Sequence, residues 1–223
     1  LPVAFTNNFM EVLIIGANGK IGQRIVKQLK NSPHNALAMV RKPQQQAGLE
    51  AMGAKTVLAD LEKSLDPAFS SKPDAVIFTA GSGGHTGPEK TTAIDLQGAK
   101  KSIDAAKKHG AKRFIMISAL GTNNTDEMAE DMQHYFRAKS EADQHLVQSN
   151  LDYTILRPGM LTNENGTGSV KAAEQLADHG DLKISRDNVA TATVASLDEA
   201  KTLQKVIELL DGPTPIKDAL ASV

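Results

Sequence analysis

Tyr135 and Lys139 are the two side chains whose types and spacing best suit proton transfer. They are four residues apart, so on a helix they would share one face. A lysine ammonium beside a phenol favours the phenolate and lowers the phenol pKa toward the working pH. Such a tyrosine can exchange a proton with a carbonyl or alcohol oxygen while a hydride moves to or from nicotinamide. Ser118 ends an apolar run and offers a hydroxyl that can orient the same oxygen. The alternative is that Tyr135 and Lys139 are helix residues without a catalytic role.

A glycine-rich stretch, VLIIGANGKIG at residues 12–22, supplies a candidate site for the cofactor that this chemistry needs. Gly16 would permit a tight turn, Gly19 the close approach of a pyrophosphate, and Gly22 the packing of a helix on the sheet. The spacing is G-x-x-G-x-x-G, one residue longer than the commonest dinucleotide-binding pattern, and a plain strand-to-helix turn is the alternative. The cofactor-binding residues predicted in this stretch are Gly16, Asn18, Gly19, Lys20, Ile21 and Gly22.

The end of the second apolar run indicates which dinucleotide is bound. An NAD site usually carries a carboxylate there for the ribose hydroxyls, but here Arg41 and Lys42 occupy the place. Cations attract the additional phosphate of NADP(H), and an arginine can donate to two of its oxygens. We therefore expect NADP(H) to be preferred over NAD(H), the alternative being two solvated surface cations.

Later strand ends add further candidate cofactor contacts. Asp60 and Leu61 follow the third run and are expected near the adenine, although Asp60 would equally suit a helix N-cap. Small residues follow the fourth run, where a dinucleotide would cross the switch point of a sheet. They are Ala80, Gly81 and Ser82.

Short apolar runs that alternate with longer amphipathic segments must position these residues. Strands are expected at 12–16, 36–40, 55–59, 74–80, 113–118, 152–157 and 206–210, most of them covered on both faces. Helices are expected at 20–30, 44–52, 89–109, 129–148 and 187–199, with one more at the C-terminal end, and Gly110 as a C-cap. This alternation predicts an α/β fold, a doubly wound Rossmann-type parallel sheet with helices on both faces. We expect a single domain over residues 1–223, in which residues 158–223 form a small substrate-capping part.

The amino-acid composition indicates which partners, metals and cellular compartment to expect. The 223 residues carry 25 basic and 26 acidic side chains, a net charge of −1 that gives no reason to expect nucleic acid or a membrane surface as partner. The chain has no cysteine, which fits the cytoplasm, and its six histidines lack ligand spacing, so no metal is expected. Residues 1–9 precede a methionine and carry no positive charge, so we expect a short frayed extension rather than a signal peptide.

Eight segments in a fixed order together resemble the short-chain dehydrogenase/reductases, specifically the short atypical NAD(P)-binding group named after epimerases and dehydratases. The resemblance extends from Glu11 to Ala221 and rests on VLIIGANGKIG, MVRK, VLADL, FTAGSG, IDLQGAKKSIDAAKKHGAKRFIMIS, HYFRAKSEAD, LDYTILRPGMLT and ISRDNVA.

The resemblance implies that Ser118, Tyr135 and Lys139 form a catalytic tetrad with a fourth residue, usually asparagine, which here is Asp95. A carboxylate there could pair with Lys139 and weaken its influence on Tyr135, or could hold a helix or backbone group. The resemblance also implies nicotinamide contacts from the segment after the sixth strand. These residues are Pro158, Gly159, Met160 and Leu161.

Three functions remain open at this point. The first is an NADP(H)-dependent oxidoreductase acting on a small carbonyl or alcohol, as a monomer or a homodimer. The second is a dinucleotide-binding sensor or interaction protein without chemistry, which the Asp95 departure favours. The third is an epimerase or dehydratase that uses the cofactor transiently. Only about 65 residues follow the sixth strand, which argues against a site for a nucleotide sugar.

Overall fold

A nine-stranded, mostly parallel sheet organises the computed structural model, which describes residues 9–83, 86–178 and 180–223. The strand order is β11-β8-β10-β6-β5-β4-β1-β2-β3, and the strands from β10 to β3 are parallel. The order β3-β2-β1-β4-β5-β6 is that of the predicted doubly wound Rossmann fold, which the structure confirms. The expected N-terminal extension lies almost entirely in residues 1–8, outside the described residues.

The seven strands for which ranges were predicted lie close to those ranges, and four further short strands occur between residues 160 and 215. The strands are β1 (Glu11–Ile15), β2 (Asn35–Val40), β3 (Lys55–Leu58), β4 (Ala75–Phe78), β5 (Arg113–Ile117), β6 (Asp152–Pro158), β7 (Met160–Thr162), β8 (Ser169–Ala173), β9 (Lys183–Ser185), β10 (Lys205–Asp211) and β11 (Thr214–Pro215). The apolar runs of β4 and β5 are buried along their whole length because helices cover both faces. The prediction of full burial was wrong for β3, which is partly exposed because it forms the edge of the sheet.

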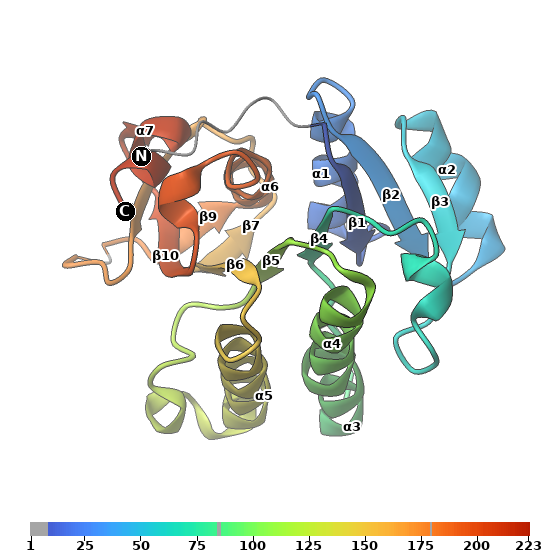
Figure 1. Cartoon of the computed structure of the whole chain (residues 1–223). Helices are drawn as coiled ribbons and strands as arrows, with labels where there is room; N and C mark the ends of the chain where they lie inside the picture. Colours follow the sequence, from blue (N-terminus) through green and yellow to red (C-terminus); the bar gives the residue numbers. More distant parts are fainter. Residues whose placement is uncertain (1–8, 84–85, 179) are drawn as a thin grey trace.

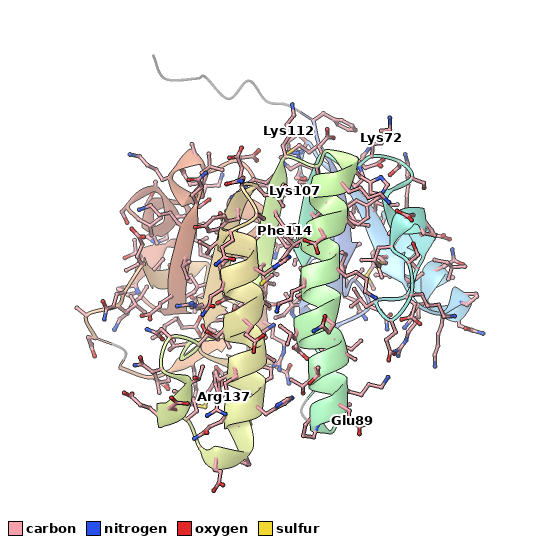
Figure 2. The ribbon with its side chains drawn as sticks, turned by 60° about the horizontal axis from the view of Figure 1, so that its bottom comes forward. Lys72, Glu89, Lys107, Lys112, Phe114 and Arg137 are labelled. Carbon is pink, nitrogen blue, oxygen red and sulfur yellow. The ribbon has the colours of Figure 1, made fainter. Side chains whose placement is uncertain are left out.

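Two groups of helices cover the two faces of the sheet (Figure 1). The helices are α1 (Lys20–Leu29), α2 (Gln46–Ala51), α3 (Pro88–Lys90), α4 (Ala99–His109), α5 (Glu130–Val147), α6 (Arg186–Ala195) and α7 (Ile216–Ala221). Short 3-10 turns occupy Pro43–Gln45, Asp66–Phe69, Thr125–Glu127 and Ala200–Thr202. Helices α1, α6 and α7 share one hydrophobic core with the sheet, and α4 and α5 share the other. Figure 2 shows α4 and α5 side by side along their face.

The predicted helix at residues 89–109 is not uniform. The chain forms α3, then a π-helical stretch from Thr91 to Gly98, and only then α4. Gly110 ends α4 with φ +81°, which confirms the predicted C-cap. Wider π turns occur frequently at functional sites, and this one contains the buried Asp95.

The C-terminal part, residues 159–223, packs beside the parallel strands. After β6, strands β7 and β9 form a small two-stranded sheet, while β8 pairs antiparallel with β10. Helix α6 begins at Arg186 with the Ser185 hydroxyl as its N-cap and ends at Ala195, earlier than predicted, since Ser196 to Asp198 turn away from the helix axis. This part therefore supplies new side chains at the carboxyl end of β6.

Candidate functional site

The loop between β1 and α1 has the geometry that a pyrophosphate requires. Gly16 has φ +92°, and a Cβ on it would lie 2.6 Å from the Ala80 nitrogen, so only glycine fits there. A Cβ on Gly22 would lie 2.3 Å from the Gly16 oxygen, which shows how closely the helix packs on the loop. A Cβ on Gly19 would meet only that oxygen, at 3.2 Å, so its outer side is open. Helix α1 begins at Lys20 without a side-chain cap, which leaves its first amides available to an anion.

A cavity of about 500 Å³ extends from this loop across the ends of β2, β3 and β4. It is lined by nine of the predicted cofactor contacts, namely Gly16, Asn18, Gly19, Arg41, Asp60, Leu61, Ala80, Gly81 and Ser82. Lys42, also predicted, is absent from the lining, although its backbone and that of Arg41 donate to the Gln45 side chain, which fixes this turn. Asp60 accepts a hydrogen bond from the Glu62 amide, so it also caps a turn.

A second cavity, of about 680 Å³, continues the first past Gly19 and Ser82 toward α5. Its lining includes Lys20 and Ile21 from the loop and all four predicted catalytic side chains, Asp95, Ser118, Tyr135 and Lys139. The two cavities together form one groove over the carboxyl ends of the parallel strands. In doubly wound sheets this crevice is where a dinucleotide lies.

Lys139 is held at the floor of the groove by two contacts. Its ammonium donates to the Ile117 carbonyl at 3.1 Å and lies 3.7 Å from the Asp95 carboxylate. The other Asp95 oxygen accepts a hydrogen bond from the Ser82 amide at 2.9 Å. Asp95 therefore makes both of the contacts left open by the sequence, one to the lysine and one to the backbone of the β4 loop.

A buried ion pair that the sequence analysis missed lies behind Ser118. Asp143 comes one helical turn after Lys139 on α5, and its Oδ2 accepts from the Arg157 guanidinium at 3.1 Å. Burial raises the pKa of the Asp143 carboxyl, and the positive charge of Arg157 opposes that shift. Ser118, which is 5% exposed, lines the groove and lies close enough to the Asp143 carboxyl to oppose the same shift. The four-residue spacing from Lys139 was a signal that could have identified Asp143.

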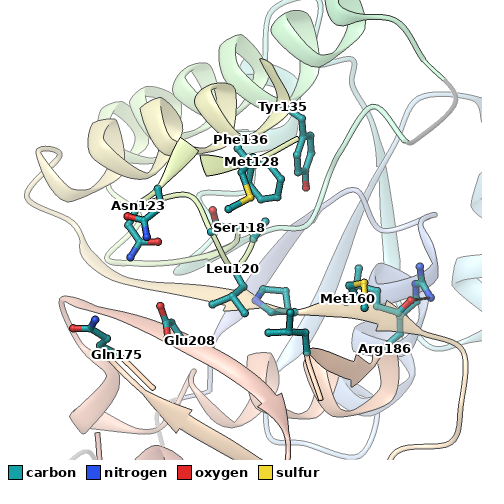
Figure 3. A pocket seen from close by; sticks show the side chains of 17 residues that line it. Ser118, Leu120, Asn123, Met128, Tyr135, Phe136, Met160, Gln175, Arg186 and Glu208 are labelled. Carbon is teal, nitrogen blue, oxygen red and sulfur yellow. Dashed lines mark hydrogen bonds between the residues drawn. The ribbon is translucent and has the colours of Figure 1, made fainter. Parts of the chain in front are cut away.

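A third cavity, of about 690 Å³, opens beside the groove and shares Ser118, Tyr135, Leu161 and Arg186 with it (Figure 3). Its walls are mainly apolar. Of the residues predicted to contact nicotinamide, only Leu161 reaches the groove, and Pro158, Gly159 and Met160 line this third cavity instead. They lie there because β7 pairs with β9. The chain packs closely at this point, since a Cβ on Gly159 would lie 2.2 Å from the Leu182 oxygen.

Arg186 was not among the predicted site residues. It is the first residue of α6 and lies in the segment ISRDNVA, which supported the family resemblance but was not assigned a role in the site. Its guanidinium donates to the Leu161 carbonyl and the Asn163 side chain, which holds it between the groove and the third cavity.

Residues 16–200 match the model of a protein family described as NAD(P)H-binding. The chain belongs to this NAD(P)H-binding family. The Bacillus subtilis protein named "Uncharacterized sugar epimerase YhfK" is 51% identical over 214 residues, which cover 95% of this chain and 99% of that protein.

Solved structures of similar proteins agree with the family assignment. A Bacillus halodurans protein provisionally named an NAD-dependent epimerase/dehydratase has a TM-score of 0.92 and 44% identity, covering 96% of this chain and 100% of its own. The oxidoreductase ylbE from Lactococcus lactis has a TM-score of 0.84 and 30% identity, covering 96% of both chains. The resemblance to atypical short-chain dehydrogenase/reductases is thus confirmed.

In the part of this NAD(P)H-binding protein that the structure describes, no helix is long and apolar enough to cross a membrane. The same residues contain no group of three or more His, Cys, Asp or Glu side chains arranged around a common point that would suit a metal ion.

Proposed function

We propose that the protein is an NADP(H)-dependent oxidoreductase that acts on a small carbonyl or alcohol compound. The observation that carries the proposal is the meeting of Ser118, Tyr135 and Lys139 in a groove that begins at the glycine-rich loop and opens into a mainly apolar cavity. A nicotinamide bound in this groove would supply or accept the hydride.

The chain's own residues would handle the proton. Tyr135 lines both the groove and the adjoining cavity, so its phenol can give a proton to, or take one from, a substrate oxygen at their junction. The Ser118 hydroxyl lines the same junction and can donate to the same oxygen. Lys139 lines the groove beside it, and its ammonium lies 3.7 Å from the Asp95 carboxylate.

Replacing Tyr135 by phenylalanine tests this role. The variant should lose about 10²- to 10⁴-fold of its NADPH-dependent carbonyl reduction, because a general acid contributes that much, while NADPH still binds. Turnover is followed by NADPH absorbance, and binding by the thermal shift. Unchanged turnover would reject the mechanism. Failure of both forms to turn over any carbonyl, with cofactor binding intact, would favour the sensor.

Arg41 supports NADP(H) as the preferred cofactor because it lines the groove at the end of β2, where an NAD site usually carries a carboxylate. In a thermal-shift titration NADPH should stabilise the protein more than NADH does, and Arg41→Ala should abolish the difference. Lys42→Ala is the matched control, since Lys42 is outside the groove lining and should matter less. Equal shifts with both cofactors in the unmodified protein would contradict the assignment.

The epimerase named among the relatives is the second candidate, supported by the 51% identity to that protein. An epimerase returns the hydride to its own substrate, so it would convert a sugar without net consumption of NADPH. Product analysis after incubation with UDP-glucose and catalytic NADP+ distinguishes the two.

A further inference from the structure

The geometry points to the substrate class: we propose that the third cavity takes a carbonyl compound with an apolar body and a carboxylate, and that the carboxylate binds Arg186. This inference rests on the proposed function, because it names the substrate of the same site. It is carried by the lining of the cavity and by the position of Arg186.

The body of the cavity is built for an apolar group. Six large apolar side chains line it, namely Leu120, Met128, Phe136, Met160, Leu161 and Leu182. Three of them are unusually exposed for their type, Met160 at 61%, Leu161 at 37% and Leu182 at 43%. An apolar ligand that covered them would gain free energy roughly in proportion to the area removed from water.

Arg186 is the only cation among the described residues that line this cavity. Its Nη1 donates hydrogen bonds to the Leu161 carbonyl and to the Asn163 amide oxygen, both of which are neutral. The neighbouring carboxylate, Asp187, is instead held by Arg24. Burial lowers the pKa of the Arg186 guanidinium, and so does the positive charge of Arg24. An anion at this point would relieve both effects, and a carboxylate matches the planar donors of a guanidinium.

The position of Arg186 also locates the reacting carbonyl. Arg186, Ser118 and Tyr135 all line both the cavity and the cofactor groove, so they surround one junction. A 2-oxo acid, whose carbonyl lies beside its carboxylate, would place both groups at this junction.

Glu208 is the only acidic side chain among the described residues that line the cavity. It lies 3% exposed on β10 and accepts a hydrogen bond from the Leu176 amide. In Figure 3 it lies at the opposite end of the cavity from Arg186, so the cation and the acid line different ends of the cavity.

Phenylpyruvate and phenylacetone provide the matched test, because they differ only in that a methyl group replaces the carboxylate. With NADPH, we expect kcat/KM for phenylpyruvate to exceed that for phenylacetone at least about tenfold, the ratio that a charge-assisted hydrogen bond supports. Pyruvate should be a poor substrate because it lacks an apolar body. Arg186→Gln should remove the preference for phenylpyruvate, whereas Lys183→Gln, which alters a cation outside the lining on β9, should leave it intact.

A binding measurement separates failure of this inference from failure of the proposed function. Calorimetry with the NADP+-bound protein should show that phenylacetate binds at least about tenfold more tightly than phenylacetamide, and that Arg186→Gln abolishes the difference. If this holds but no carbonyl is reduced, the oxidoreductase is wrong and the ligand class stands. Equal turnover of phenylpyruvate and phenylacetone, or an Arg186→Gln variant that weakens only NADPH binding, would overturn the inference and assign Arg186 to the cofactor. Circular dichroism and the NADPH thermal shift show whether each variant is folded.

Discussion

Three glycine-to-alanine variants separate what the glycine-rich loop does for folding from what it does for the cofactor. Gly22→Ala puts a Cβ 2.3 Å from the Gly16 oxygen and 2.7 Å from the Ala17 Cα, both backbone atoms. Gly19→Ala puts a Cβ 3.2 Å from the Gly16 oxygen and close to no other atom. The φ angle of Gly19 is −72°, which alanine adopts freely. Gly48→Ala, in α2, meets nothing within 4 Å and is the control.

The expected changes in the free energy of unfolding differ in sign as well as in size. Overpacking against backbone, which cannot move aside as a flexible side chain would, should cost Gly22→Ala about 3 kcal/mol, or roughly 6–12 °C in Tm for a chain of this size. Gly48→Ala should gain about 0.5–1 kcal/mol, because alanine loses less backbone entropy in a helix. Gly19→Ala should leave the cofactor-free Tm within about 2 °C, since a strain-free substitution at a surface site changes stability little.

A titration with NADPH then tests whether this loop is only a turn or also binds the pyrophosphate. At a hundred times its Kd, NADPH should stabilise the unmodified protein by about 2.7 kcal/mol. A methyl group on Gly19 stands where the pyrophosphate must approach, so a tenfold loss of affinity should remove about half of that stabilisation. The assay is a thermal-shift titration of all three variants. A Gly19→Ala variant with an unchanged NADPH shift would refute the assignment of this loop to the pyrophosphate.

Two further substitutions change the charges behind the site. Asp95→Asn removes the carboxylate that lies 3.7 Å from the Lys139 ammonium but keeps an oxygen that can accept from the Ser82 amide, so it should lower NADPH-dependent turnover while NADPH still binds; unchanged turnover would show that Asp95 only holds the backbone. For Asp143, burial raises the pKa, so the native state binds a proton more tightly than the unfolded chain. Its contribution to stability is therefore greatest below the ordinary carboxyl pKa and is lost as pH rises through the raised value. In urea unfolding at a series of pH values, the stability difference between the unmodified protein and Asp143→Asn should shrink as pH rises, and a constant difference would contradict this.

Much of the fold could be predicted from local sequence. The apolar runs of β1, β2, β4, β5 and β6 have the length and composition of strands covered on both faces, and each helix between them has an amphipathic pattern. These features depend on neighbours in the chain, so their order along the sequence already implies a doubly wound sheet. Element ends were less certain, as for α6, because tertiary contacts decide where a helix stops.

Part of the candidate site was equally local. The glycine spacing and the Tyr135–Lys139 spacing are set by the geometry of one turn and one helix, so each pattern carries its own structural meaning. The π-helical stretch around Asp95 had no such pattern, since its residues also suit an ordinary α-helix. It took the packed structure to show Asp95 between Lys139 and the Ser82 amide.

The sequence by itself determined the fold class, the glycine-rich loop and the proton-transfer candidates, because these depend on residues that are close in the chain. Only the tertiary structure decided what surrounds the substrate. Arg186, Glu208 and the apolar walls come from α6, β10 and several loops that are far apart in sequence. They meet because β6 lies between β5 and β10 in the sheet. The pairing of β6 with β10 brings the C-terminal part to the carboxyl ends of the strands. A contact between distant segments depends on how the whole sheet packs, so no local pattern of residues marks it in advance.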